Sequence, residues 1–235
     1  MRKSIILPAV CLLQQAFAKY SVHVTYSPNL VTVGDADIFG LTWTEIYAAQ
    51  GNQNAVVLQP SKSSRADACK EGGRSQDTTV SADIEGQWGR DPGLGAHDSR
   101  EAIVQAYWDF MKVFMADNQY KLWAECVHVN GRNALTPWWP TASACTGGGC
   151  AGCSGTSGLE CQYGDTGFRV PAKVKVTMTN AQGQLMSDGL TISFSSTQSG
   201  GNGGCGLAGA IAGQLAGLIP GAGQYINAGI SVACA

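Results

Sequence analysis

Cysteine is the residue type whose number and spacing give the clearest chemical signal in this chain. The 235-residue sequence contains nine cysteines, and Cys11 lies in an apolar run near the N-terminus. The other eight are Cys69, Cys126, Cys145, Cys150, Cys153, Cys161, Cys205 and Cys234. Eight is an even number, so in an oxidising compartment the sequence predicts four disulfides. Eight cysteines allow roughly 100 connectivities, and their spacing does not choose among them.

Cys150 and Cys153 have the CxxC spacing of a zinc or redox site. Between Cys145 and Cys161, however, the sequence has no histidine and no second CxxC pair, which a structural zinc site would need. No strand pattern leads into Cys150 and no helix pattern follows it, as a thioredoxin-type site would require. We therefore interpret these cysteines as disulfide-bonded, and we expect no metal and no cofactor.

The triplet Asp165-Thr166-Gly167 matches the motif of aspartic proteases, in which two carboxylates share one proton. A protease with two lobes needs a second such triplet, and Asp188-Gly189 is not one. The half-sized, dimeric type needs an apolar strand before the triplet, where this chain has Gln162-Tyr163-Gly164. We interpret Asp165 as a residue of a surface turn.

Histidines and paired carboxylates are the remaining acid–base candidates. His97 precedes Asp98, but Asp98 fits the role of a helix N-cap, and His23 and His128 lie in strand patterns that favour structural roles. Two carboxylate pairs have a spacing compatible with glycoside hydrolysis, namely Asp35/Asp37 and Asp83/Glu85. A chain with 17 acidic residues contains such pairs by chance. The sequence has no G-x-S-x-G elbow, P-loop, dinucleotide fingerprint or HExxH motif, so we assign no catalytic residue.

Residues 1–18 have the layout of a cleaved secretory signal, with a basic start, an apolar run and a small-residue cleavage site. These parts are Arg2-Lys3, Ile5 to Leu13 and Ala16-Phe17-Ala18. The apolar run of about nine residues is too short to span a bilayer, which takes about 20. We expect cleavage before Lys19 and a secreted, extracellular mature chain.

Composition limits the classes of function and divides the mature chain. Hydrophobic residues make up 44% of the sequence, charged residues 14%, and the net charge is -2. The chain can therefore build a core, but it lacks the clustered basic charge that nucleic acid requires. Residues 19–140 hold 24 charged side chains, whereas residues 141–235 hold 21 of the 31 glycines. We expect an α+β subregion over 19–140 and a Cys/Gly-rich subregion over 141–235.

Alternating apolar and polar residues predict several strands. These strands are Tyr20–Tyr26, Ala55–Leu58, Tyr120–Val129 and a hairpin of Phe168–Met178 with Leu190–Phe194. Residues 61–95 are polar and glycine-rich and are predicted to be mostly loop, with a turn at Asp91-Pro92-Gly93.

The clearest predicted helix begins at Asp98, with Glu101 completing a capping box. Two parallel apolar stripes follow, formed by Ile103, Tyr107, Phe110 and Phe114 and by Val104, Trp108, Met111 and Met115. An apolar face this wide predicts that the helix is mostly buried and organises the core.

The C-terminal 47 residues, 189–235, contain no charged residue. Two apolar runs, Gly206 to Ile219 and Gly221 to Ala233, meet at Pro220, and each is too short to cross a bilayer. Glycines spaced by four, Gly209, Gly213 and Gly217, would let two helices approach closely and are candidates for membrane or partner contact. We predict a small-residue helical hairpin closed by a Cys205–Cys234 disulfide.

Together these patterns predict an α+β fold, in which an antiparallel sheet of four or five strands packs on one long buried helix beside the disulfide-rich lobe. The short signal, eight mature cysteines and glycine-rich lobe resemble the small secreted cysteine-rich proteins of fungi, a class that includes effector-like and killer-toxin-like proteins. The resemblance implies an extracellular, non-enzymatic protein that binds a cell surface, a membrane or a protein partner. The alternatives are a secreted hydrolase with a carboxylate or histidine site, and an extracellular structural protein.

Overall fold

The computed structural model describes residues 20–49, 54–66, 76–128, 142–144, 159–198 and 226–234. Within the large sheet the strands are β1 (Tyr20–Tyr26), β3 (Ala55–Leu58), β4 (Ser61–Ser64), β5 (Thr78–Gln87), β9 (Lys173–Asn180), β10 (Leu185–Ser196) and β11 (Ile226–Cys234). A second sheet contains β2 (Leu30–Gly34), β6 (Gln119–His128), β7 (Ala142–Ala144) and β8 (Leu159–Pro171). The helical elements are a π-helical turn η1 (Gly40–Thr44), α1 (Glu45–Ala48) and the long α2 (Ala96–Asp117).

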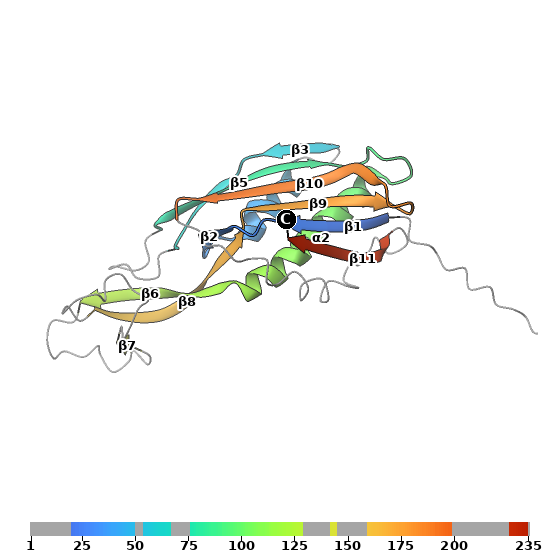
Figure 1. Ribbon diagram of the computed structural model, residues 1–235. Helices are drawn as coiled ribbons and strands as arrows, with labels where there is room; N and C mark the ends of the chain where they lie inside the picture. Colours follow the sequence, from blue (N-terminus) through green and yellow to red (C-terminus); the bar gives the residue numbers. More distant parts are fainter. Residues whose placement is uncertain are drawn as a thin grey trace, which may run out of the picture.

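The large sheet has seven strands in the order β11-β1-β9-β10-β5-β3, and β4 also pairs with β5 (Figure 1). All its neighbours are antiparallel except β1 and β11, which are parallel. The predicted α+β class with an antiparallel sheet and one long helix is therefore confirmed, but the predicted strand number was too small. The sheet combines strands from both predicted subregions.

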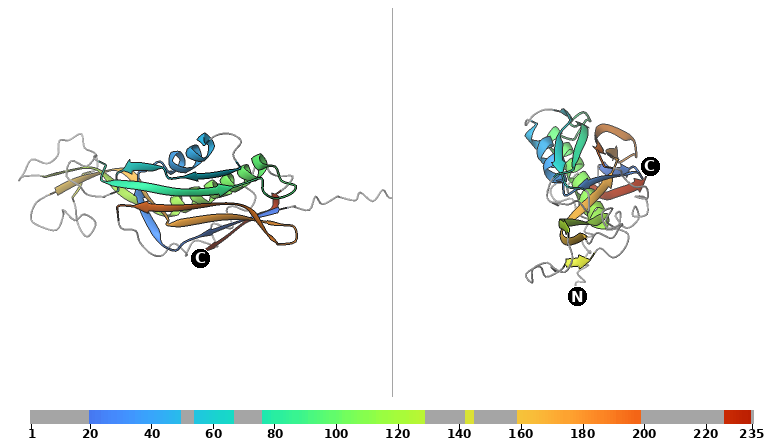
Figure 2. Two further views of the ribbon diagram at one scale, coloured as in Figure 1. Left: turned by 90° about the horizontal axis from the view of Figure 1, so that it is seen from above. Right: turned by 90° about the vertical axis from the view of Figure 1, so that its left-hand side faces the viewer.

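The helix α2 lies along one face of this sheet (Figures 1 and 2). Its predicted stripe is confirmed, because Ile103, Tyr107, Phe110 and Phe114 are fully buried. Tyr26 of β1 packs against two of these rings, with its ring centroid 5.1 Å from that of Phe110 and 5.4 Å from that of Phe114. Burial of aromatic rings at such distances is a large part of the energy of a core.

The predicted capping box is wrong. The helix begins at Ala96, and its N-cap is Gly95, which has an extended backbone and makes no side-chain cap bond. Asp98 therefore lies inside the first turn, where its charge still interacts favourably with the helix dipole. Glu101 accepts a hydrogen bond of 2.7 Å from the Tyr47 hydroxyl instead of closing a box.

Two strands, β4 and β5, occupy the stretch that we predicted to be mostly loop. In β5 the residues Val80, Ala82 and Ile84 are fully buried and alternate with exposed or half-buried polar residues. Such alternation is typical of a strand with one face exposed to solvent, and here the buried side chains are small. The turn at residues 91–93 is confirmed.

The C-terminal strand β11 corrects the predicted helical hairpin. Its residues 226–233 fall in the second apolar run, and they pair in parallel with β1 instead of forming a helix. Ile226, Ile230 and Val232 are β-branched and favour a strand, and the edge of β1 offers backbone hydrogen bonds to one. The first apolar run, with Gly209, Gly213 and Gly217, lies outside the described residues.

The strands β6 and β8 form a long ribbon in the second sheet (Figure 1). The first strand of the predicted hairpin, Phe168–Met178, is divided between the two sheets. Its first residues belong to β8, which ends at Pro171, and the rest belong to β9, which begins at Lys173. Asp165-Thr166-Gly167 lies within β8, where it pairs with residues 120–122 of β6, so the predicted surface turn is wrong.

Candidate functional site

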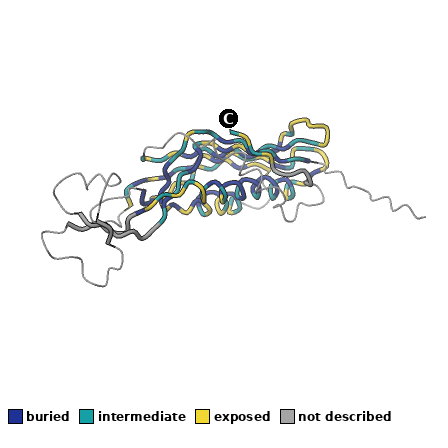
Figure 3. The backbone as a smooth tube through the Cα atoms, turned by 60° about the horizontal axis from the view of Figure 1, so that its bottom comes forward, coloured by how far each residue is buried: buried dark blue, intermediate teal, exposed yellow. Residues whose placement is uncertain are grey.

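One face of the large sheet points away from α2, and we call it the open face. Along β1, β5, β9 and β10, buried residues alternate with half-buried or exposed ones (Figure 3). The buried set faces the helix, so the other set forms the open face. Its members are Ser21, His23, Thr25, Val57, Ser81, Asp83, Glu85, Lys173, Lys175, Thr177, Thr179, Gly189, Thr191 and Ser193. Hydroxyl and charged side chains dominate this surface.

The strand register arranges the charges of the open face in rows. Lys175 of β9 pairs with Thr191 of β10, which pairs with Glu85 of β5. A parallel row joins Lys173, Ser193 and Asp83. Two strand spacings separate each lysine from its carboxylate, which puts their Cα atoms about 10 Å apart.

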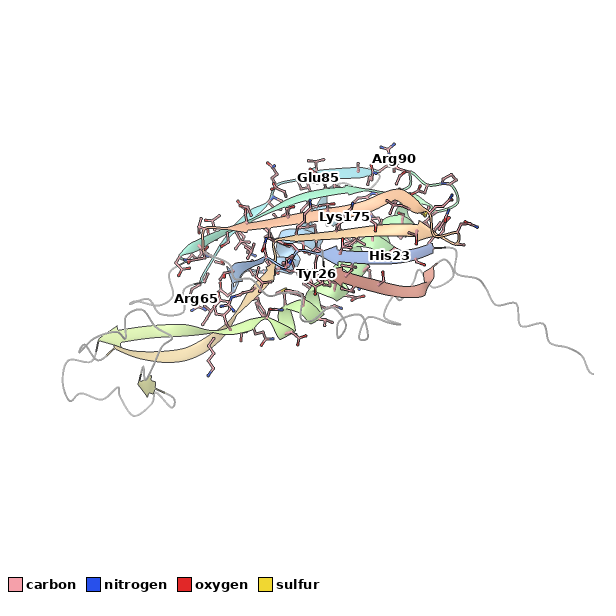
Figure 4. The ribbon with its side chains drawn as sticks, viewed as in Figure 1. His23, Tyr26, Arg65, Glu85, Arg90 and Lys175 are labelled. Carbon is pink, nitrogen blue, oxygen red and sulfur yellow. The ribbon has the colours of Figure 1, made fainter. Side chains whose placement is uncertain are left out.

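No salt bridge joins Lys175 or Glu85 to any other described residue. The two side chains come from β9 and β5 of the same sheet (Figure 4). Opposite charges that stand apart across a hydroxyl-bearing strand are available to a ligand that carries the complementary charges.

A groove of about 460 Å³ lies between these charges. Lys175, Thr177, Thr191 and Glu85 line it, together with residues of β3 and of the start of β10. Apolar side chains form part of its rim, since Val57 is 77% exposed and Leu185 is 69% exposed. The groove thus combines two charges, hydroxyl donors and acceptors, and an apolar edge.

Gly189 lines the middle of the groove, between Thr177 of β9 and Gln87 of β5. A Cβ atom at this position would lie 2.9 Å from the carbonyl oxygen of Val176, closer than such atoms approach in proteins. The close approach of β9 and β10 therefore requires glycine, and the missing side chain keeps the surface hollow.

The groove ends where β10 bulges between Leu185 and Gly189. At the bulge, the carboxylate of Asp188 turns inward and is 1% exposed. It accepts hydrogen bonds from the backbone N–H groups of Gly89 (2.8 Å) and Arg90 (2.9 Å) and from the Ser99 hydroxyl (2.6 Å). These donors replace the water that the buried charge has lost.

Asp91 completes this arrangement from the other side. Its carboxylate accepts hydrogen bonds from the backbone N–H groups of Ser187 (3.2 Å) and Asp188 (2.9 Å). The loop after β5 and the bulge of β10 therefore bind each other through reciprocal carboxylate–amide bonds. They fix the wall of the groove that Ser187 and Met186 line.

Beside the groove, an imidazole joins three strands of the open face. His23 Nδ1 lies 2.5 Å from Ser231 Oγ of β11, and His23 Nε2 lies 2.8 Å from Thr179 Oγ1 of β9. A neutral imidazole donates through one nitrogen and accepts through the other, so both hydroxyls can be satisfied. His23 also pairs with Thr177, which lines the groove.

The other acidic and histidine candidates have separate partners. Asp35 pairs with Arg65 at 3.1 Å, whereas Asp37 lies 3.4 Å from Lys62 and accepts the backbone N–H of Gly40 at 2.9 Å. The Gly40 N–H bond lowers the pKa of Asp37, with a smaller contribution from Lys62. These two carboxylates therefore do not act as a pair.

The predicted pair His97 and Asp98 lies on the surface, with Nδ1 and Oδ1 3.4 Å apart and both side chains largely exposed. Asp83 and Glu85, by contrast, share the open face of β5. Among the described residues no group of three or more His, Cys, Asp or Glu side chains is arranged to hold a metal ion.

The predicted disulfide residues are only partly described. Cys126 lies in β6, Cys161 in β8, and Cys234 at the end of β11, where it is disulfide-bonded. The remaining cysteines, Cys69, Cys145, Cys150, Cys153 and Cys205, lie outside the described residues. None of the helices in the described ranges combines the length and hydrophobicity needed to cross a membrane.

Sequence reasoning named Glu85 only as half of a candidate carboxylate pair, and it placed Lys175 only on the wet face of a hairpin. Their alternation with apolar neighbours was the available signal for exposure. Their relation across Thr191 depends on pairing between β5 and β10, which are about 100 residues apart in the chain. Comparisons with known proteins found no family model, no curated protein and no solved structure that matches this chain.

Proposed function

We propose that this chain is a secreted, disulfide-stabilised, non-enzymatic protein that binds a protein partner through the groove of the open face. The observation that carries this proposal is the row of Lys175, Thr191 and Glu85, in which two opposite charges without salt-bridge partners among the described residues flank a hydroxyl. The signal-like residues 1–18 and the even number of mature cysteines support the extracellular setting.

The occupant that fits this groove is an extended peptide segment that carries one acidic and one basic side chain. In an extended peptide, side chains two positions apart project to the same side about 7 Å apart, and those four positions apart about 13 Å apart. These spacings bracket the distance of about 10 Å between the Cα atoms of Lys175 and Glu85. The hydroxyls of Thr177 and Thr191 can donate to or accept from the peptide backbone. An apolar side chain of the peptide would pack against Val57 and Leu185 at the rim.

Charge complementarity favours such a peptide over a neutral glycan. A neutral ligand would take water from Lys175 and Glu85 without replacing it by opposite charge, and the desolvation of unpaired charges is unfavourable. A peptide with both charges compensates each of them and also fixes its own direction in the groove.

The test uses an array of random eight-residue peptides probed with the labelled, secreted protein. We expect enriched peptides to carry an acidic and a basic residue two or four positions apart, because these spacings put both side chains on the same side of an extended peptide. In the variant Lys175→Glu both charges of the groove are acidic, so the enriched peptides should lose their acidic residue and gain a second basic one. Lys173→Glu is the matched control, because Lys173 lies on the same strand and face but does not line the groove.

Two outcomes overturn this proposal. One is enrichment that Lys175→Glu and Lys173→Glu change equally, which would mean that net charge and not the groove selects the peptides. The other is the absence of peptide enrichment together with binding to a glycan array that Lys175→Glu abolishes, which would assign the groove to carbohydrate.

A hydrolase is the second candidate, and the contact between Ser231 and His23 favours it. A serine hydroxyl within hydrogen-bond reach of an imidazole, whose other nitrogen is held by Thr179, has the arrangement of an activated nucleophile. In acyl transfer, Ser231 Oγ would attack the carbonyl carbon and pass its proton to His23 Nδ1. That proton would then go to the leaving group, and water would release the acyl group.

A fluorophosphonate probe distinguishes this candidate from a purely structural contact. If the pair is catalytic, the probe labels Ser231, and His23→Ala abolishes the labelling while leaving the protein folded. An unlabelled wild-type protein excludes this serine chemistry and leaves the peptide-binding proposal untouched.

A further inference from the structure

Cys126 and Cys161 occupy directly paired backbone positions in the ribbon of β6 and β8. The register pairs Cys126 with Cys161, and the neighbouring pairs are Glu125 with Gln162 and Val127 with Glu160. The pairing is therefore regular on both sides of the two cysteines. The ribbon extends away from the large sheet (Figure 1).

The backbone spacing of such a pair suits a disulfide. Directly opposed residues of antiparallel strands have Cα atoms about 4.5–5.5 Å apart, and disulfides span Cα distances of about 4.4–6.8 Å. Opposed residues also project to the same side of the sheet. We propose that Cys126 and Cys161 form a cross-strand disulfide, which closes residues 127–160 into a covalent loop at the end of the ribbon.

The reaction is a thiol–disulfide exchange with a small-molecule or protein disulfide of the secretory compartment. One cysteine thiolate attacks that oxidant and forms a mixed disulfide, and the second thiolate displaces the oxidant as a thiol. Two protein thiols lose two electrons and two protons, and the oxidant is reduced to two thiols.

A parity argument then links the loop to the rest of the molecule. Residues 127–160 contain three further cysteines, Cys145, Cys150 and Cys153. Three is an odd number, so they cannot all pair with one another. If all eight mature cysteines are oxidised, at least one of the three bonds to Cys69, Cys205 or Cys234. The loop is thus tied to the body at a second point.

Peptide mapping of the secreted, unreduced protein tests the pairing directly. Cleavage after Lys and Arg and after Glu releases Cys126–Arg132 and Cys161–Arg169 as separate peptides with one cysteine each. We expect these two peptides to appear as one cross-linked species that separates on reduction. A link from either peptide to any other cysteine, or a free thiol at Cys126 or Cys161, overturns the proposal.

Serine variants provide a second measurement. Cys126→Ser should leave one thiol that alkylates without reduction, located at Cys161, and Cys161→Ser should expose Cys126 in the same way. The double variant should show no free thiol, because the six remaining cysteines stay paired. Two free thiols in the double variant would show that these cysteines have different partners.

Discussion

Ser99 Oγ donates a hydrogen bond of 2.6 Å to Asp188 Oδ2, and this bond joins the first turns of α2 to the bulge of β10. Both residues are buried, with Ser99 at 0% and Asp188 at 1% exposure. The helix on one face of the sheet is thereby connected to the strand that ends the groove on the other face. The hydrogen bond therefore attaches the wall of the groove to the core.

Replacement of Asp188 by alanine should lower the free energy of unfolding by about 3 kcal/mol or more, because three donors lose a buried, charged acceptor. Ser99→Ala should cost about 1–2 kcal/mol, since the two backbone donors to Asp188 remain. In a double-mutant cycle measured by urea unfolding, Ser99→Ala should become nearly neutral once Asp188 is alanine.

Ser187→Ala is the matched control for this cycle. Ser187 is exposed and binds Asp91 only through its backbone N–H, which alanine retains, so its change should stay within about 0.5 kcal/mol. Additive effects of Asp188→Ala and Ser99→Ala would contradict the direct contact between these two side chains.

Gly189→Ala tests the close approach that hollows the groove. The new Cβ atom would lie 2.9 Å from the Val176 carbonyl oxygen, so β9 and β10 must separate locally, and we expect a loss of about 1–3 kcal/mol. Peptide binding in the groove should weaken as well. Ser193→Ala on the same strand and face should change neither quantity by much, and equal effects of the two variants would argue against the steric explanation.

The sequence predicts the parts of the fold whose local pattern and tertiary environment agree. Tyr20–Tyr26 and the stripe of α2 have clear periods, and both are buried as expected. The strand β5 escaped prediction although Val80, Ala82 and Ile84 alternate with polar residues, because the stretch is short of large apolar side chains and rich in polar residues and glycine. In β11, glycine and alanine obscure the strand preference of Ile226, Ile230 and Val232, and pairing with the edge of β1 supports the strand.

The candidate site was less accessible to sequence reasoning. Exposure of Lys175 follows from its alternation with Val174 and Val176, and that part was predictable. The distance from Lys175 to Glu85 is set by β10, which lies between β9 and β5 in space but not in sequence. The pairing of Cys126 with Cys161 was not predictable for the same reason, since 34 residues separate the two cysteines in the chain.

Trp43 stacks between Phe39 and Tyr47 on the surface formed by η1 and α1, with ring centroids 5.5 Å and 5.0 Å away. Trp43→Ala removes both ring contacts and should lower the free energy of unfolding by about 2–4 kcal/mol. Tyr47→Phe keeps its ring and loses only the hydrogen bond to Glu101, so we expect about 1 kcal/mol. Equal losses in chemical denaturation would show that the stack contributes little.

Three tyrosines should make the fold sensitive to alkali. Burial raises the pKa of the Tyr26, Tyr47 and Tyr107 hydroxyls, and the carboxylate of Glu101 raises that of Tyr47 further. In the unfolded chain these groups lose their protons near pH 10. Between that pH and their higher native pKa values, the folded state binds more protons than the unfolded state, so the free energy of unfolding must fall as the pH rises above about 10. Below pH 10 both states are protonated, and the contribution is constant.

Absorbance of tyrosinate at 295 nm and far-UV circular dichroism, followed together from pH 8 to pH 13, should show these hydroxyls ionising only as the fold is lost. Tyr107→Phe removes one such group and should make the fall less steep by up to about 1.4 kcal/mol per pH unit. Full tyrosine ionisation with unchanged dichroism would contradict the burial of these hydroxyls.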